Sequence, residues 1–442
     1  MDETMKENLK QKIKSMLRWL QPGLGVKRWI FTILLGTTVI ALGLAVFVID
    51  LYRRAPDTWW LPLVSWASLR SLPRLARVVI FEMIGGVLIL WGIIGLNKSL
   101  LGPFLRPGHT IVDRLEKHHN KKHGPKIVAI GGGHGLSTLL RGLKAASHNI
   151  FAVVTVADDG GSSGRLRESL GILPPGDVRN CLAALSDDED LMAQLFQYRF
   201  TDAESGLKGH SFGNLFISSM AEVTGSFEQA VAESGRVLAV SGRVLPASLE
   251  NVRLIADIVD SGSGQTIRVE GESKITETEG TIKQVMLDPK NPTVYPEVIQ
   301  AILSADIIVV GPGSLYTSIL PNLLVKDIAS AIRTSQALKI FICNVATQKG
   351  ETEGFSCGDH LKVIEDHIGI NIFDIIVANN HSPKEYNPKI EAVMVEGDLR
   401  KKYAVYLNDL IDEEHPWRHD PQKTTRVLMD LFRERTGPLT MQ

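Results

Sequence analysis

Two short apolar runs, each followed at once by a glycine-rich turn and an apolar helix, constrain this fold most. Lys126–Ile130 (KIVAI) precedes Gly131–Gly135 (GGGHG), and Ile307–Val310 precedes Gly311–Ser318 (GPGSLYTS). Each run is rich in β-branched residues and too short to show helical periodicity, which favours a buried strand. Strand, glycine turn and helix form the first unit of a doubly wound α/β domain. Two such units predict one parallel sheet with both turns at the same edge.

These two turns are candidate phosphate-binding loops. A glycine turn at a helix start lets a phosphate approach backbone N–H groups at the positive end of the helix dipole. The first turn meets neither the GxGxxG dinucleotide pattern nor the Walker A pattern, and taken alone it is also compatible with a tight turn that holds no ligand. Two turns together favour a diphosphate ligand. The residues expected to contact it are Gly131, Gly132, Gly133, Gly135, Ser137, Gly311, Gly313, Ser314 and Thr317.

A polar loop follows the second predicted strand, Phe151–Val156. Asp158 and Asp159 come first and are candidate Mg²⁺ ligands, because carboxylate oxygens are preferred by that cation. Glycines, serines and two arginines follow, and arginine neutralises phosphate charge. A solvated Asp-Asp-Gly-Gly turn is the alternative interpretation. The candidate binding residues here are Gly160, Gly161, Ser162, Ser163, Arg165 and Arg167.

Two further helix starts carry polar side chains. Asp177 is predicted to be the N-cap of a helix over Val178–Leu185. Capping does not account for Arg179 and Asn180 in the same turn, so both are candidate ligand contacts. The segment Gly209–Asn214 (GHSFGN) opens a helix over Leu215–Val223, and there His210 and Asn214 are candidates for contacting a nucleotide or a transferred group. A capping or packing role is the alternative for this histidine.

The rest of the chain completes an α/β alternation. Leu254–Leu287 alternates apolar and polar residues, which predicts a small antiparallel excursion. We therefore expect residues 126–442 to form a Rossmann-like, doubly wound, mostly parallel sheet with that excursion. The other predicted elements are helices over Glu297–Leu303, Leu361–Ile368 and Thr424–Arg435 and strands over Lys339–Asn344 and Asp374–Ala378.

Residues 1–97 have a different character. The stretch 29–49 holds 21 residues without a charge, which as a helix spans about 31 Å, the thickness of a bilayer core. A second apolar stretch covers 78–96. We predict a hairpin of two transmembrane helices, followed by a basic, Pro- and Gly-containing linker over 98–125; a buried soluble hairpin is the alternative.

Charge predicts the orientation of this hairpin. The net charge of -1 is the sum of two unlike parts. Residues 1–126 hold 19 Lys+Arg and 8 Asp+Glu, a balance of +11. Residues 127–442 hold 29 Lys+Arg and 41 Asp+Glu, a balance of -12. Residues 1–28 hold seven basic residues and residues 97–126 hold seven more, 14 in all, whereas the connection 50–77 holds five. The positive-inside rule then places both termini and the large domain in the cytoplasm, at the inner membrane. Three widely spaced cysteines, an odd number, predict reduced thiols.

Five ordered motifs resemble one family. They are Ile130–Gly142 (IGGGHGLSTLLRG), Thr155–Arg167 (TVADDGGSSGRLR), Leu173–Leu182 (LPPGDVRNCL), Gly209–Asn214 (GHSFGN) and Val310–Leu324 (VGPGSLYTSILPNLL). Together they are similar to the YvcK proteins, or gluconeogenesis factors, which are relatives of the 2-phospho-lactate transferase CofD. The resemblance covers about residues 126–435. His134 departs from the threonine expected there, and the paired membrane helices depart from the plain cytoplasmic form.

The resemblance implies a regulator that binds a nucleotide-sugar such as UDP-N-acetylglucosamine and links carbon metabolism to cell-wall synthesis and cell shape, with no established reaction. The first hypothesis is accordingly a membrane-tethered UDP-sugar-binding regulator with cell-wall or metabolic protein partners. The second is a CofD-like, Mg²⁺-dependent transferase that moves a phospholactyl-type group from a nucleotide diphosphate carrier to a hydroxyl acceptor. A membrane scaffold that only binds proteins is the third. We expect no nucleic-acid partner, and a homo-oligomer is compatible with the sequence.

Overall fold

The computed structural model describes residues 124–186, 189–201, 206–381 and 391–436, with a few isolated positions between 37 and 83. The predicted membrane helices 29–49 and 78–96 and the linker 98–125 lie almost wholly outside the described residues. Among those that are described, no helix is both long and apolar enough to cross a bilayer. The chain divides into two compact units at residues 119 and 120, and all elements below belong to the second unit.

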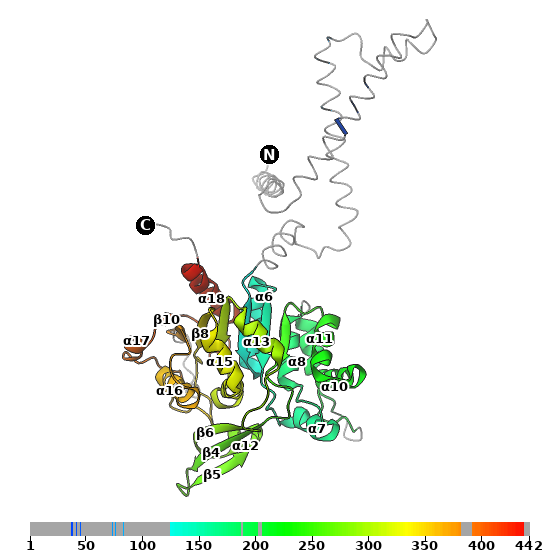
Figure 1. Ribbon diagram of the computed structural model, residues 1–442. Coiled ribbons are helices and arrows are strands. Elements are labelled where there is room, and N and C mark those ends of the chain that lie inside the picture. Colours follow the sequence, from blue (N-terminus) through cyan, green and yellow to red (C-terminus); the bar gives the residue numbers. More distant parts are fainter. Residues whose placement is uncertain are drawn as a thin grey trace. The chain divides into compact units, whose positions relative to one another are not determined.

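A parallel sheet of seven strands organises this unit (Figure 1). The strand order is β10-β9-β8-β7-β1-β2-β3, and every neighbouring pair is parallel. The strands are β1 (Ile127–Gly131), β2 (Ile150–Val154), β3 (Arg243–Pro246), β7 (Ile307–Val310), β8 (Leu338–Ile342), β9 (Ile375–Asn379) and β10 (Val405–Asn408).

The chain order of these strands runs outward in both directions from β1. Successive strands β1 to β3 extend one way, and β7 to β10 extend the other way from the opposite edge of β1. The register aligns Ile127 of β1 with Ile150 of β2 and with Ile307 of β7. The sheet order therefore reverses between β1 and β7, and ligands of doubly wound folds bind at such a reversal. The predicted doubly wound class is confirmed.

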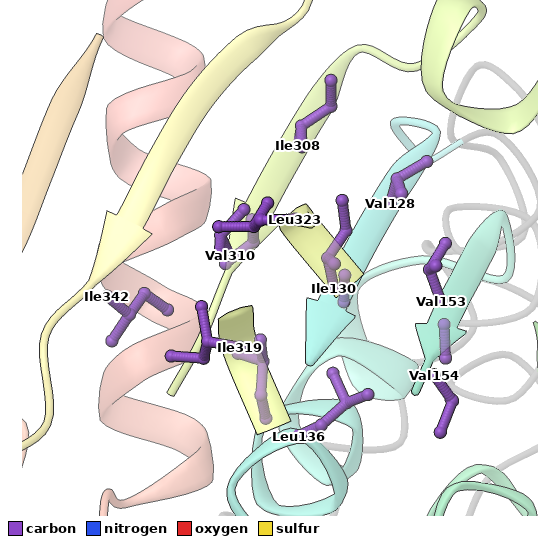
Figure 2. Close-up of a cluster of buried hydrophobic side chains, with 14 of the residues drawn as sticks. Val128, Ile130, Leu136, Val153, Val154, Ile308, Val310, Ile319, Leu323 and Ile342 are labelled. Carbon is purple, nitrogen blue, oxygen red and sulfur yellow. The ribbon is translucent and has the colours of Figure 1, made fainter. Parts of the chain in front are cut away.

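Helices cover the sheet and share its core with the strands. Four leucines of α6 (Leu136, Leu139, Leu140 and Leu143) are buried, and each contributes about 1.5–3 kcal/mol of hydrophobic stabilisation. Figure 2 shows Leu136 in one cluster with Ile130 of β1, Val310 of β7 and Ile319, side chains from both halves of the sheet. The described helices are α6 (Gly133–Ala146), α7 (Gly161–Leu170), α8 (Gly176–Leu185), α9 (Glu189–Gln197), α10 (Phe212–Thr224), α11 (Phe227–Val237), α12 (Glu272–Glu277), α13 (Pro296–Leu303), η2 (Leu315–Ile319, a π-helix), α14 (Leu320–Leu323), α15 (Lys326–Thr334), α16 (Cys357–Ile368), α17 (Leu399–Lys402) and α18 (Pro421–Thr436).

The C-terminal helix α18 includes the predicted range Thr424–Arg435 and packs against the core. The buried side chains Val427 and Leu428 of α18 join the main core, and α18 packs on α6. A Cβ at Gly142 of α6 would lie 2.1 Å from the carbonyl oxygen of Pro421. This glycine therefore permits the close approach of the two helices.

The predicted antiparallel excursion is a separate three-stranded sheet with the order β5-β4-β6. Its strands are β4 (Arg253–Asp260), β5 (Thr266–Glu270) and β6 (Gly280–Asp288), and α12 connects β5 to β6. In Figure 1 this sheet projects from the main sheet at the same end as α7. The three cysteines are free and buried.

Candidate functional site

A cavity of about 800 Å³ lies where the sheet order reverses; we call it the main cavity. It is open between the two glycine turns, the segment that follows β8 and a segment that precedes α18. Its lining residues are Gly132, Gly133, His134, Gly135, Thr138, Asp158, Asp177, Asn180, Glu272, Pro312, Gly313, Ser314, Ser318, Asn344, Val345, Ala346, Thr347, Gln348, Lys349, Trp417, Arg418 and His419.

The first glycine turn brings unused backbone donors to this cavity. Helix α6 has Gly132 as its N-cap and no side-chain cap, and its first intrahelical bond runs from Leu136 N to Gly132 O (3.3 Å). The N–H groups of His134 and Gly135 consequently have no acceptor within the helix. Gly133 has a φ of +59°, which favours glycine. The helix dipole adds positive potential, so this turn can bind an anion.

The second glycine turn lines the same cavity but is tied to buried side chains. The Glu351 carboxylate accepts hydrogen bonds from Tyr316 N (3.2 Å) and Thr317 Oγ1 (3.0 Å) at the start of η2. Asn344 Oδ1 accepts from Gly313 N (3.1 Å), and Asn344 Nδ2 donates to Gly313 O (2.8 Å). The helix start that was predicted to hold a ligand anion therefore holds a carboxylate of the chain itself.

Three carboxyl groups reach the main cavity. Desolvation by burial raises the pKa of Asp177 to about 7, and the nearby charge of Asp158 adds to this rise. Burial also raises the pKa of Asp158 and raises that of Glu272 well above its ordinary value. Glu272 belongs to α12, so the small antiparallel sheet contributes to the cavity. At neutral pH Asp177 therefore still binds protons that ordinary surface carboxylates have lost.

The two adjacent aspartates proposed as a metal pair are separated. Asp158 lines the cavity and accepts a hydrogen bond from Gly160 N (2.8 Å). Asp159 Oδ1 instead accepts from the backbone N (3.0 Å) and the Oγ (2.9 Å) of Ser273, at the start of α12. Among the carboxylates that the structure describes, Asp177 rather than Asp159 is the neighbour of Asp158 at the cavity.

The predicted capping role of Asp177 is wrong. Helix α8 begins at Gly176 with Pro175 as N-cap, so Asp177 lies one residue inside the first turn. There its carboxylate accepts a backbone hydrogen bond from Gly133 of the first glycine turn. This contact turns Asp177 toward the first glycine turn instead of toward its own helix.

A smaller hollow of about 210 Å³ lies beside the main cavity; we call it the α7 hollow. The two share Asp158, Asp177 and Asn180. The other lining residues are Gly160, Gly161, Ser162, Ser163, Gly176, Arg179, Arg199 and Asn214.

The three arginines proposed as phosphate ligands have different environments. Arg179 lines the α7 hollow and donates to Ser211 Oγ (2.7 Å). Arg165 lines neither space and donates to the carbonyl of Lys208 (2.9 Å). The Arg167 side chain donates to Asn251 Oδ1 (2.6 Å) and to the carbonyl of Val252 (2.6 Å). Arg167 therefore fastens α7 to the loop before β4.

Other predicted site residues lie behind the cavity walls. His210 is buried, and its Nδ1 lies 3.1 Å from Ser162 Oγ; burial, together with the charge of Arg165, lowers its pKa. Ser137 Oγ donates to the carbonyl of His134 (3.0 Å) and so supports the first turn. Gly131 and Gly311 likewise line neither space and lie at the ends of β1 and β7.

Sequence reasoning missed one wall of the main cavity. Trp417 is 47% exposed there, and Arg418 and the buried His419 follow it. Burial lowers the pKa of His419 to about 4, so it is neutral at physiological pH. No motif marks this segment. The opposite segment, Asn344–Lys349, follows a strand that was predicted, and its place at the carboxyl edge was the signal that could have identified it.

Comparison with known proteins agrees with these motifs. The family model described as 2-phospho-L-lactate transferase CofD matches residues 127–433. The gluconeogenesis factor of Bacillus subtilis is 47% identical over 325 residues, which cover 70% of this chain and 99% of that protein. A relative from Nostoc sp. is 45% identical over 441 residues, covering 95% of this chain and 93% of its own.

A crystal structure shares the fold of the α/β unit. A protein of the UPF0052 family from Bacillus halodurans matches with a TM-score of 0.63 and 44% identity, covering 69% of this chain and 99% of that chain. The relatives thus have two lengths, one confined to the α/β unit and one that reaches into the N-terminal unit. The five motifs, the sheet and these relatives agree: the chain belongs to the gluconeogenesis factor (YvcK) family, within the group matched by CofD.

Proposed function

We propose that this chain binds a nucleotide-sugar, such as UDP-N-acetylglucosamine, in the main cavity. The observation that carries the proposal is the uncapped start of α6, whose His134 and Gly135 N–H groups face a space of about 800 Å³. Such a volume lies in the range of small-molecule sites. As a family member with this ligand, the protein would act as a regulator that links carbon metabolism to cell-wall synthesis and cell shape.

The walls of the cavity suit the parts of such a ligand. The diphosphate would accept from the N–H groups of the first turn, while the exposed Arg418 guanidinium adds positive charge. Trp417 offers an aromatic face to a base. His134 stands at the helix start; burial, then the charges of Arg418, Arg179 and Arg141, lower its pKa, so the imidazole is neutral in the free protein.

Mg²⁺ would be held by Asp158 and Asp177 rather than by Asp158 and Asp159. Both lie at the cavity, and both offer the oxygen atoms that Mg²⁺ prefers. Because the pKa of Asp177 is about 7, Mg²⁺ must displace a proton there below that pH. Nucleotide affinity should therefore rise between pH 6 and pH 8 with Mg²⁺ and fall over the same range without it. Asp158→Asn should remove the Mg²⁺ effect, and Asp159→Asn serves as the matched control.

Calorimetry of the full chain with UDP-N-acetylglucosamine, UDP and GDP tests the binding proposal. A Cβ at residue 135 would lie 2.4 Å from the carbonyl oxygen of Pro312, so Gly135→Ala must shift the first turn. We expect UDP-sugar affinity to fall at least tenfold in that variant. Gly397→Ala is the matched control, because a Cβ there meets nothing within 4 Å. Absence of binding by the unaltered protein would refute the proposal.

Asp177 favours a second candidate, the CofD-like transferase. A carboxyl with a pKa near 7 at the junction of two spaces suits a general base. It would take the proton of an acceptor hydroxyl as that oxygen bonds to the distal phosphorus and the diphosphate bridge breaks, releasing a nucleoside monophosphate. Incubation with a GDP-linked phospholactyl donor and a deazaflavin acceptor, followed by chromatography, tests this. Stoichiometric GMP and product would favour the transferase; an unchanged donor would exclude that reaction.

We also propose that residues 29–49 and 78–96 tether the protein to the inner membrane with the α/β unit in the cytoplasm. The support is the length of both apolar stretches and the basic excess on their outer flanks. Washing membranes with alkaline carbonate distinguishes the outcomes. The full chain should stay in the pellet, and residues 124–442 alone should appear in the supernatant. Release of the full chain would refute the tether.

A further inference from the structure

The α7 hollow begins at a helix N-terminus with no side-chain cap. The N-cap of α7 is Gly160, and the first intrahelical bond runs from Gly164 N to Gly160 O (3.1 Å). The N–H groups of Gly161, Ser162 and Ser163 thus have no acceptor within the helix. All three residues line the hollow. A helix start alone does not define a binding site, so the assignment depends on the side chains around it.

Two nearly fully buried side chains line this hollow and keep an unused polar atom. Asn214 is 1% exposed, and its Nδ2 donates to Ser163 Oγ (3.4 Å), yet no donor in the described part of the chain reaches its Oδ1. Arg179 is 9% exposed; its Nη atoms have partners, but among the described residues its Nε has none. Each such buried atom costs about 1–3 kcal/mol unless a ligand or water satisfies it. One unused acceptor and one unused donor thus belong to residues that line the same hollow.

The composition of the lining limits what the hollow can bind. It consists entirely of glycine, serine, aspartate, asparagine and arginine, so it offers no aromatic or large apolar surface to a base. Arg179 and Arg199 supply positive charge. Asp158 and Asp177 border the hollow on the side that it shares with the main cavity. A small oxyanion suits this set of groups.

We propose that the α7 hollow binds a hydrogen-bearing phosphate, separately from any ligand of the main cavity. The phosphate oxygens would accept from the N–H groups of α7 and from Arg179 Nε, and the P–OH would donate to Asn214 Oδ1. Sulfate has similar size and charge but carries no proton at neutral pH, so it leaves Asn214 Oδ1 unpaired. The phosphate is either inorganic or the terminal group of a second ligand, since the hollow joins the main cavity at Asp158, Asp177 and Asn180. This assignment goes beyond the nucleotide proposal and does not depend on it.

Competition titrations of the full chain with inorganic phosphate, sulfate and glycerol 3-phosphate test the proposal. Phosphate should bind at least tenfold more tightly than sulfate at pH 7. Asn214→Ala should reduce that preference to less than threefold, because the P–OH loses its acceptor. At pH 5.5, where a phosphomonoester with a second pKa of about 6 keeps its P–OH, tighter binding of glycerol 3-phosphate than of inorganic phosphate would assign the site to a phosphomonoester, and the reverse order to the free ion. No binding of either at millimolar concentration would overturn the proposal.

Exposed-residue variants keep the test independent of folding and of nucleotide binding. Arg199→Gln changes an exposed side chain of the hollow and should weaken phosphate binding at least fivefold. Arg236→Gln is the matched control, because that arginine is exposed and does not line the hollow. Gly135→Ala, which alters the main cavity, should leave phosphate affinity unchanged. Phosphate binding lost in Gly135→Ala and kept in Arg199→Gln would place the anion in the main cavity and overturn the assignment.

Discussion

The two glycine turns follow neighbouring strands and look alike in sequence, yet they differ in what they leave free. The first turn has no side-chain cap and presents the His134 and Gly135 N–H groups to the main cavity. The second turn is fixed by Glu351 and Asn344. A glycine-rich turn can therefore be a ligand loop or a tied structural loop. Both turns contact a carboxyl group of the chain, Asp177 at Gly133 and Glu351 at Tyr316, and they differ in which backbone N–H groups this contact occupies.

The largest effect is expected on stability, when the second glycine turn loses its carboxylate partner. Glu351→Ala removes the acceptor of Tyr316 N and Thr317 Oγ1 in a buried place, so we expect a loss of about 4 kcal/mol in the free energy of unfolding. Urea unfolding followed by circular dichroism measures this. UDP-sugar affinity should change less than threefold under conditions where the variant is folded. A stable variant with lost affinity would reverse the comparison.

The next effect concerns the stability contributed by Asp177, the carboxyl group that contacts the first glycine turn. Asp177 has a pKa of about 7 in the folded chain and about 4 when unfolded, so the folded state binds more protons between these values. Stability is consequently lost as the pH rises from about 4 to 7. Asp177→Asn should remove this loss and stabilise the protein by about 4 kcal/mol at pH 8. Its effect at pH 4 should be near zero, and equal effects at both pH values would contradict the assigned shift.

A substitution in the first glycine turn should weaken UDP-sugar binding. Gly133→Val places a β-branched residue at a φ of +59°, which it adopts with strain. We expect UDP-sugar affinity to fall about 100-fold, equivalent to about 2.7 kcal/mol. Calorimetry gives the affinity, and thermal unfolding shows whether the fold persists. Unchanged affinity would exclude the first turn as the diphosphate loop.

The smallest expected effect concerns the wall opposite the turns. Trp417→Ala should weaken UDP-sugar binding about tenfold, because a stacked base contributes about 1–3 kcal/mol. Trp417→Phe keeps an aromatic face and should recover most of the affinity. Quenching of tryptophan fluorescence on ligand addition, compared between the unaltered chain and Trp417→Phe, reports the same contact. Equal affinities of the alanine and phenylalanine variants would exclude stacking.

The sequence predicted those strands whose own residues show a clear hydrophobic pattern. Central strands such as β1 and β7 are buried on both faces, so they appear as continuous apolar runs next to glycine turns. The edge strands β3 and β10 have only four residues each, and those of β10 are half-buried, so they carry no comparable pattern.

The site was less predictable, because residues far away in the sequence determine which side chains reach the cavity. Asp158 and Asp159 are equivalent in sequence, and Ser273, 114 residues further along the chain, determines which one faces the cavity. Glu351 occupies the second turn in the same way, 35 residues after Tyr316. Trp417 belongs to a segment with no regular pattern, so only the tertiary structure places it beside the glycine turns.

The pairing of β1 with β7 has a consequence for the order in which the protein is made. About 180 residues separate these strands, and the Asn322 amide that donates to the Gly131 carbonyl lies 191 residues after it. During synthesis β1 keeps an unpaired edge until the ribosome has produced most of the chain, and such edges invite wrong pairing. The main cavity exists only after that edge closes. A ligand that binds there would select chains in which both halves of the sheet have met.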